Sequence, residues 1–146
     1  MKCSYRLRIV KWKDEEAALR SIRTAVFIHE QHVPVHLEWD EFDAISMHIL
    51  AQDFDEQSIG TVRLLPNGYV SRMAVLKEWR RKGIGTAMMQ KLLQQAENLG
   101  VQQIKLNAQV SAIQFYERFG FQVFGKEFMD AGILHIKMEL RLNVKL

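Results

Sequence analysis

The sequence is poor in cysteine and has no long apolar run. Cys3 is the single cysteine among 146 residues, which excludes an internal disulfide and argues against a secreted, disulfide-rich protein. No stretch approaches the ~20 apolar residues of a membrane span, and the N-terminus lacks the apolar run of a secretory signal. These absences predict a cytoplasmic protein without a membrane segment.

Neither sign of charge dominates the chain. The 20 basic and 17 acidic residues give a formal net charge of +3. The acids crowd residues 38–56, and the bases are scattered except at Arg80–Lys82. A nucleic-acid binder would gather its basic excess into one patch, so we expect no nucleic-acid partner. A small basic pocket for a phosphorylated ligand fits this distribution better.

Two motifs of catalytic sites are also missing. The sequence has no H-x-x-x-H or H-E-x-x-H pair and only one cysteine, so no metal site is predicted. The absence of G-x-S-x-G argues against an α/β-hydrolase. The length of 146 residues and the apolar content of 48% predict one domain over residues 1–146.

Hydrophobic periodicity predicts a mixed α/β domain. Strands are expected at 7–12, 48–52, 59–65, 69–75, 104–108, 121–124 and 133–142. Helices are expected at 14–27, 83–99 and 111–119, the first and last capped by Asp14 and Ser111. Residues 30–43 contain Pro34 and no clean period, which indicates a loop or a broken helix. The order of these elements predicts one sheet with helices on its faces.

The chain is organised around residues 69–100, which read as a strand, a basic turn with two glycines and a long amphipathic helix. The turn places Arg80–Lys82 at the positive end of the helix dipole, where each cation costs about 0.3–1 kcal/mol. A bound anion would reverse this cost, because the free N–H groups of the helix start and the cations all attract it. The turn therefore predicts a phosphate or pyrophosphate site.

Two motifs resemble those of the GCN5-related N-acetyltransferase (GNAT) superfamily. Residues 73–75 followed by 80–85 (MAV and RRKGIG) resemble its acetyl-CoA motif. Residues 106–108 (LNA) and 115–121 (FYERFGF) resemble its second motif at the expected distance. The resemblance implies a mixed, mostly antiparallel twisted sheet of six to seven strands, with about four helices and a splayed central strand pair.

A narrower resemblance points to the bacterial ElaA/YjcF-like branch of this superfamily. It is carried by the motifs E-Q-x-V-P at 30–34, E-x-D at 38–40, His48 and E-F-x-D-A-G-I-x-H at 127–135. The branch has no firmly established common substrate, so the narrower resemblance leaves the acceptor open.

The superfamily resemblance implies that acetyl-CoA binds as a cosubstrate. Backbone N–H groups around residues 81–85 would hold its pyrophosphate, and the main chain of residues 73–75 would pair with the pantetheine arm as an added strand does. The implied cofactor-binding residues are Met73, Ala74, Val75, Arg80, Arg81, Lys82, Gly83, Ile84, Gly85, Thr86, Asn107 and Tyr116.

Tyr116 matches the superfamily's general acid, which protonates the departing CoA thiolate. A phenol with a pKa of about 10 can share a proton with a thiol of about 8.5. However, Tyr116 also lies on the apolar stripe of its predicted helix, so its spacing alone fits a core tyrosine equally well.

The acceptor is expected to be a primary amine of a small molecule or peptide. Deprotonating an alkyl amine at pH 7 costs about 4–5 kcal/mol, so a base or a desolvated pocket is needed. The candidate bases are Glu30, Glu38, Asp40, Asp43, His48 and His135. Glu30 and His135 rank first because both lie in motifs of the narrower branch.

Two alternatives stay open beside the acetyltransferase. Residues 23–27 and 38–43 (RTAVF and EWDEFD) are similar to acyl-homoserine-lactone synthases, which share this fold. A CoA-binding sensor without turnover is the second alternative. The chain is expected to be a monomer or a homodimer.

Overall fold

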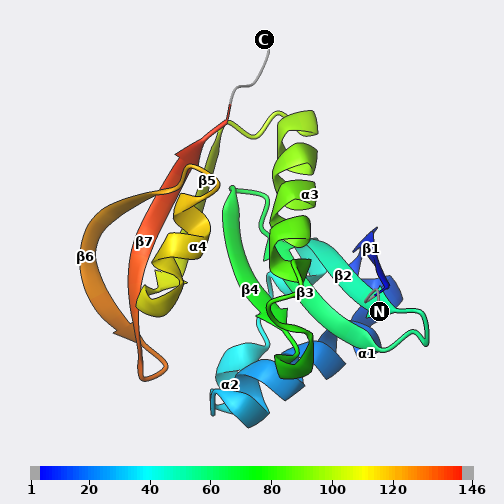
Figure 1. Ribbon diagram of the computed structural model, residues 1–146. Helices are drawn as coiled ribbons and strands as arrows, with labels where there is room; N and C mark the ends of the chain where they lie inside the picture. The colour runs from blue at the N-terminus through cyan, green and yellow to red at the C-terminus, as the bar shows by residue number, and fades with distance from the viewer. Residues whose placement is uncertain (1–3, 143–146) are drawn as a thin grey trace.

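The computed structural model describes residues 4–142, which form one seven-stranded sheet with helices on both faces (Figure 1). Cys3 lies outside the described residues. The strands are β1 (Tyr5–Val10), β2 (Met47–Asp53), β3 (Ser58–Leu64), β4 (Tyr69–Val75), β5 (Gln103–Gln109), β6 (Gln122–Asp130) and β7 (Ile133–Arg141). Their spatial order is β1-β2-β3-β4-β5-β7-β6, and every neighbouring pair except β4–β5 is antiparallel. The predicted mixed, mostly antiparallel sheet is confirmed.

The central parallel pair is splayed, as the resemblance implied. β4 and β5 pair at Tyr69 with Lys105 and at Val70 with Leu106, near the start of β4. Beyond Val70 they separate, and Figure 1 shows the sheet dividing there into a β1–β4 half and a β5–β7 half. Main-chain groups of β4 and β5 past this point are left for another partner.

Helices cover the two faces of the β1–β4 half. The helices are α1 (Trp12–Arg23), which continues as a π-helical segment (Thr24–Glu30), α2 (Val35–Glu38), α3 (Ile84–Asn98) and α4 (Ile113–Glu117). Leu50 of β2 packs against Leu19 of α1, whereas its neighbour Ile49 belongs to the cluster of Met88 on α3. Because successive strand residues point to opposite faces, α1 and α3 lie on opposite sides of the sheet.

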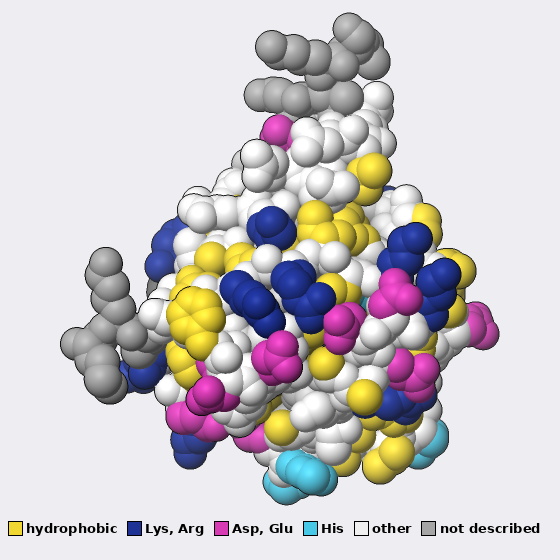
Figure 2. Space-filling view, turned by 90° about the vertical axis from the view of Figure 1, so that its right-hand side faces the viewer, with side chains coloured by type: hydrophobic (Ala, Val, Ile, Leu, Met, Phe, Trp, Pro, Cys, Tyr) yellow, Lys and Arg dark blue, Asp and Glu magenta, His cyan; other side chains and the backbone are white. Residues whose placement is uncertain are grey.

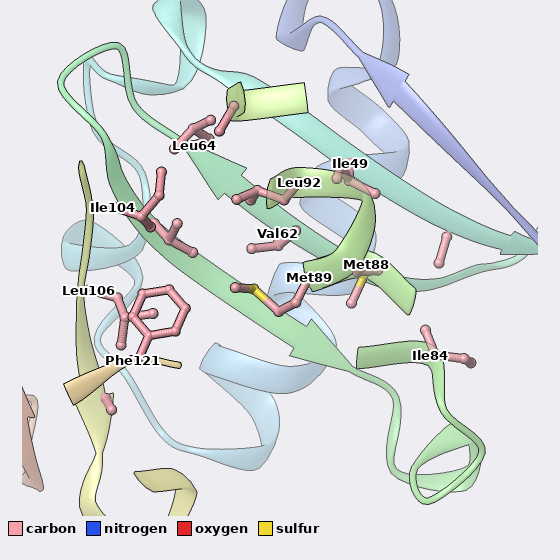
Figure 3. Packing of buried hydrophobic residues seen from close by; sticks show 14 of the residues in the cluster. Ile49, Val62, Leu64, Ile84, Met88, Met89, Leu92, Ile104, Leu106 and Phe121 are labelled. Atoms are coloured by element: carbon pink, nitrogen blue, oxygen red, sulfur yellow. The ribbon is translucent and has the colours of Figure 1, made fainter. Parts of the chain in front are cut away.

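The larger core lies between α3 and the sheet (Figure 3). Ile84, Met88 and Leu92 recur at helical spacing and are at most 1% exposed. They meet Val62 of β3, while Leu106 of β5 belongs to the same cluster and so ties the second half of the sheet to the first. Each fully buried side chain of this kind contributes about 1.5–3 kcal/mol of burial energy. The predicted amphipathic helix is thereby confirmed.

Both predicted helix caps are wrong. The N-cap of α1 is Lys11, the one residue between the end of β1 at Val10 and Trp12, which packs against Val10. No side chain of residues 4–142 caps this end, and the helical backbone is interrupted at Glu15 (φ −133°), directly after Asp14. Residues 110–112 form a 3-10 turn, so α4 begins at Ile113 and Ser111 caps nothing. The first helix also runs past its expected end, as π-helix up to Glu30.

The strand predicted at 121–124 is longer than its pattern indicated. β6 reaches Asp130, and its pairing with β7 shifts between Phe124 and Phe128. The strand lies at the sheet edge with all nine residues exposed, so alternating burial, the signal that reveals a strand in the sequence, is absent. Gly125, at φ +85°, falls within the shifted segment.

A β-bulge interrupts β4 where the sheet divides. Thr61 of β3 pairs with Ala74 and Arg63 pairs with Ser71, so two residues of β4, Arg72 and Met73, stand opposite one residue of β3. Arg72 adopts φ +56°, a left-handed conformation that is uncommon for a residue with a side chain. Such bulges redirect side chains and are frequent beside active sites.

A buried network of charged side chains surrounds this bulge. Arg23 of α1 is fully buried and binds Glu38 at 2.8 Å and Asp43 at 2.6 Å. Arg63 binds Asp43 at 2.9 Å, and Arg72 binds Glu38 at 3.0 Å. Buried ion pairs of this kind add little net stability. Removing one partner, however, leaves the other charge buried without a partner and costs about 3–5 kcal/mol. The network fixes α1, α2 and the bulge relative to one another.

His48 is buried beside this network and makes folding sensitive to acid. Its Nε2 donates to the Asp43 carbonyl at 2.9 Å, and its buried Nδ1 has no partner among the described residues. Burial lowers the pKa of His48 from its ordinary 6.5, and the neighbouring cations Arg23 and Arg63 lower it further, against the opposing effect of Asp43.

We therefore expect stability to fall below pH 6.5. The unfolded chain binds a proton near that pH and folded His48 only at lower pH, so its contribution is complete above 6.5 and is lost as the pH drops. The loss should approach about 1.4 kcal/mol per pH unit. Urea unfolding at pH 7.5 and 5.0 measures it. His48→Gln, whose amide can still donate to Asp43, should show less of this loss; an equal loss in both proteins would contradict the assignment.

Candidate active site

A cavity of about 1040 Å³ lies where β4 and β5 separate. Its walls come from the π-helical segment, α2 and the loop between them, from β4, and from the turn before α3 with the first residues of α3. The end of β5 with α4 and the β6–β7 turn complete them. The volume is at the upper end of the roughly 300–1,000 Å³ typical of small-molecule sites. The space suits a long ligand.

The structure brings eleven of the twelve predicted cofactor-binding residues to this cavity. They are Met73, Ala74, Val75, Arg80, Arg81, Gly83, Ile84, Gly85, Thr86, Asn107 and Tyr116. Lys82 is the exception: it does not line the cavity, and its ammonium lies 5.5 Å from the centre of the Trp79 ring.

The turn before α3 presents main-chain N–H groups to the cavity. Arg81 at φ +64° and Gly83 at φ +82° reverse the chain, and Gly83 is the N-cap. No side chain of residues 4–142 caps this helix end, so its first N–H groups stay available. A Cβ on Gly85 would lie 3.4 Å from the Phe115 ring, so the main chain approaches α4 closely there. These features suit a bound phosphate.

Arg80 connects this turn to both β4 and the π-helical segment. Its Nε donates to the Val75 carbonyl at 2.9 Å, and its two Nη atoms bind both oxygens of Glu30 at 2.6 Å. The Arg80 guanidinium lowers the pKa of the Glu30 carboxyl, and Glu30 in turn raises the pKa of Arg80. A carboxylate held deprotonated by a bidentate ion pair is a weak base, and Glu30 does not line the cavity. The base role of Glu30 stays a prediction that this geometry disfavours.

Tyr116 lies both in the cavity wall and against the core. Its ring packs edge-on to Phe115 and Phe121, at centroid distances of 5.0 and 5.9 Å. Its hydroxyl is 3.7 Å from the sulfur of Met73 on the bulge. Burial raises the pKa of Tyr116 to about 12, so the phenol keeps its proton at neutral pH. The ring therefore packs as a core tyrosine does, and the hydroxyl faces the bulge; the role of Tyr116 as general acid stays a prediction.

His135 closes the opposite wall on β7. Its Nδ1 is 2.7 Å from the carbonyl oxygen of Ile133. Its ring stacks on the ring of Phe128, with the two ring centres 5.9 Å apart. A carbonyl can only accept, so Nδ1 carries the proton and the neutral ring has a lone pair at Nε2. His135 also pairs in register with Gln109, whose amide donates to Gln31 at 3.2 Å. His135 thus contributes an imidazole ring to this end of the cavity wall.

Two cavity-lining residues are not among the first choices made from the sequence. Arg72 carried no signal, because nothing in the sequence marks a bulge at a non-glycine residue. Glu38 was weighed as a base and placed below Glu30, yet it lines the cavity and Glu30 does not. Of the other candidates, Asp43 and His48 are buried in the network and, like Asp40, do not line the cavity.

Some kinds of site find no support in residues 4–142. No three His, Cys, Asp or Glu side chains gather there as a metal site would require. No helix within this range is long and apolar enough to cross a membrane. On the face shown in Figure 2, basic and acidic side chains lie interspersed, so that face has no field of a single sign.

Comparisons with known proteins agree with this architecture. A family model described as the acetyltransferase (GNAT) domain matches residues 11–142. The uncharacterized N-acetyltransferase YjcF of Bacillus subtilis (strain 168) is 40% identical over 121 residues, which cover 80% of this chain and 86% of YjcF.

Solved structures share the fold over nearly the whole chain. An acyl-CoA N-acyltransferase from Pseudomonas aeruginosa superimposes with a TM-score of 0.84 and 30% identity, covering 93% of this chain and 99% of the other. Escherichia coli ElaA gives a TM-score of 0.84 at 24% identity, with the same coverage. The acyl-homoserine lactone synthase BjaI shares the fold at a TM-score of 0.77 and 15% identity, covering 94% of this chain and 83% of its own.

Proposed function

Because this chain belongs to the GNAT acetyltransferase family, in the branch of YjcF and ElaA, we propose that it moves an acetyl group from acetyl-CoA to a primary amine. One observation carries the proposal. A single cavity runs between the anion-attracting start of α3, the diverging strands β4 and β5, and the hydroxyl of Tyr116. A long anionic thioester needs these three parts in one continuous space.

The cofactor would use main-chain groups at both ends of its bound part. The N–H groups at the start of α3 would hold the pyrophosphate, with Arg81 beside them. Arg80, engaged with Glu30, would position the turn rather than bind phosphate alone. Residues 73–75 would pair with the pantetheine arm as an added strand, in the space that β5 leaves open.

Transfer would proceed by direct attack of the amine in a ternary complex. The amine nitrogen forms a bond to the acetyl carbon, and the carbon–sulfur bond breaks. Tyr116 gives its proton to the departing sulfur, and the proton still on the nitrogen restores the phenol. The Val75 N–H is our candidate donor to the carbonyl oxygen as it becomes negative. His135, with its free Nε2, is our candidate base for the acceptor.

A screen for thiol release tests this function. Purified protein is incubated with acetyl-CoA and, in turn, tyramine, tyrosine, histamine, histidine, putrescine, ornithine, amino sugars and peptides. We expect stoichiometric CoA thiol and acetylated amine with at least one acceptor. If no amine stimulates thiol release, the transferase proposal fails; tight CoA binding without turnover would instead favour a sensor.

The N–H groups at the start of α3 also predict which part of CoA contributes to its binding affinity. Calorimetric titration with CoA and with pantetheine, which lacks the pyrophosphate, should give a dissociation constant at least about 100-fold lower for CoA, since several charge-assisted hydrogen bonds of about 1.5–3 kcal/mol each are added. The difference should shrink in high salt, which screens charges. Equal affinities would contradict a pyrophosphate site here.

One alternative has a specific observation behind it. The sequence run shared with acyl-homoserine-lactone synthases contributes Arg23, Glu38 and Asp43, which form the buried network beside the cavity. Product analysis with S-adenosylmethionine and acyl-CoA or acyl carrier protein separates the two activities. Formation of an acyl-homoserine lactone would replace the acetyltransferase proposal.

A further inference from the structure

One acidic residue of the buried network lines the cavity. Glu38 is 3% exposed and lines the cavity wall, whereas Asp40 and Asp43 of the same network do not. The cavity wall has one further carboxylate, the exposed Asp130. Burying a charged group is costly, and acids with perturbed pKa values cluster at functional sites. A carboxylate this deeply buried at the edge of an active-site cavity is therefore a candidate for function.

One oxygen of Glu38 is held by the network, and the other is open. Its ion pairs with Arg23 and Arg72 both use Oε2, and its main-chain carbonyl accepts from the same two arginines. Oε1 forms no hydrogen bond within residues 4–142. It is also not among the fully buried side-chain atoms without a partner, which are Arg8 Nε and His48 Nδ1. Oε1 is therefore reachable, and the cavity is the space that Glu38 lines.

The two arginines hold Glu38 in place but form ion pairs with only one of its two carboxylate oxygens. Arg23 approaches from α1 and Arg72 from β4, while Asp43, beyond Arg23, is a like charge that acts on it. Burial raises the pKa of Glu38 above its ordinary value, and the two arginines oppose this only in part. A carboxylate with a raised pKa accepts protons more readily than an exposed one.

We propose that Glu38, in place of His135, binds the ammonium group of the acceptor through Oε1 and accepts its first proton. The proposal rests on the transferase function above. The ammonium loses one proton to Glu38, which passes it to solvent, and the free amine attacks the acetyl carbon. Its second proton reaches the sulfur by way of Tyr116. Ammonium and acetyl-CoA thus give amide, CoA thiol and one released proton.

The same charges define the class of acceptor. The charge of Arg72 is paired with Glu38 and Asp40, and that of Arg80 with Glu30, so neither offers an unpaired positive charge to an acceptor carboxylate. The remaining arginines of the wall, Arg81 and Arg118, belong to the turn before α3 and to the end of α4. The acceptor is therefore an amine cation with no carboxylate beside its nitrogen.

Matched variants of the network separate function from structure. Glu38→Gln and Asp43→Asn each remove one charge of a nearly buried carboxylate bonded to Arg23 and a second arginine, and only the first residue lines the cavity. Thermal unfolding and the dissociation constant of CoA are measured for both. Kinetics use the panel amine that gives wild type its highest rate. Glu38→Asp, which keeps the charge, is the variant to use if Glu38→Gln does not fold.

We expect Glu38→Gln to lower kcat/KM for the amine at least about 10-fold, the equivalent of one charged hydrogen bond. Its CoA affinity should stay unchanged, and the loss of rate at acid pH should be weaker than in wild type. Asp43→Asn should keep that acid limb. The proposal is overturned if Glu38→Gln keeps the wild-type kcat/KM, if both variants lose it equally, or if Asp130→Asn alone removes the acid limb.

The same screen tests the class of acceptor, because it contains three pairs of an amine and the corresponding amino acid. Tyramine, histamine and putrescine differ from tyrosine, histidine and ornithine by one carboxylate. We expect the decarboxylated member of each active pair to have a kcat/KM at least 10-fold higher. Preference for the amino acids would overturn the class while leaving the transferase function intact, whereas inactivity with every amine would remove that function itself.

Discussion

Replacing Tyr116 by phenylalanine is expected to lower kcat about 100-fold or more, the usual contribution of a general acid. The pKa of Tyr116, raised to about 12 by burial, keeps the phenol protonated at neutral pH, so the group that phenylalanine removes is the proton donor. The ring itself stays, and its contacts with Phe115 and Phe121 hold the local packing. The dissociation constant of CoA should therefore change less than about threefold, since one weak contact to sulfur is lost.

A second tyrosine provides the control for this substitution. Tyr5 on β1 lies outside the cavity, so Tyr5→Phe makes the same chemical change away from the site. Both variants are compared in single-turnover thiol release and in CoA titrations. A large rise in the dissociation constant for Tyr116→Phe, with kcat preserved, would assign Tyr116 to binding and packing instead of acid catalysis.

Gly68→Ala is expected to destabilise the protein by about 3 kcal/mol, from overpacking and left-handed strain together. Gly68 has φ +91°, and an added Cβ would lie 2.4 Å from the main-chain oxygen of Gln103. Its own carbonyl accepts from the amide of Lys105 at 3.0 Å, next to the two residue pairs that join β4 to β5. The methyl group would therefore push the two halves of the sheet apart where they meet.

Gly100→Ala isolates the contribution of the contact. Gly100 has a similar φ of +78°, but a Cβ there would meet no atom within 4 Å. It should lose only the conformational part, about 1 kcal/mol. The free energy of unfolding in urea measures both variants. Equal losses would show that backbone conformation, and not the approach of Gln103, decides the requirement for glycine at 68.

Local patterns predicted the elements that bury one regular face. The apolar stripe of α3, the glycine after it, and the strand at 69–75 were all visible because each depends on spacing within a few residues. The splayed pair and the residues of the cavity followed from motif resemblance rather than from spacing. The caps failed because Trp12 joins the core and starts α1 early, a tertiary effect that outweighs the preference of Asp14 for a cap.

Features made by distant residues could not be predicted. Glu30 and Arg80 are 50 positions apart, and their ion pair engages the carboxylate that the sequence ranks among the first candidate bases. The bulge at Arg72 and the open oxygen of Glu38 likewise depend on side chains from three separate elements. A single sequence records the residue types in such a network but not which of them meet.

The division of the sheet also bears on how the molecule moves. Two residue pairs and the packing around Leu106 join the halves at one end, while at the other end no ladder of hydrogen bonds links β4 to β5. We expect the main collective motion of this fold to be a rotation of one half against the other about the joined end. That motion changes the width of the cavity directly, so a ligand spanning β4 and β5 would stiffen the whole protein as it binds.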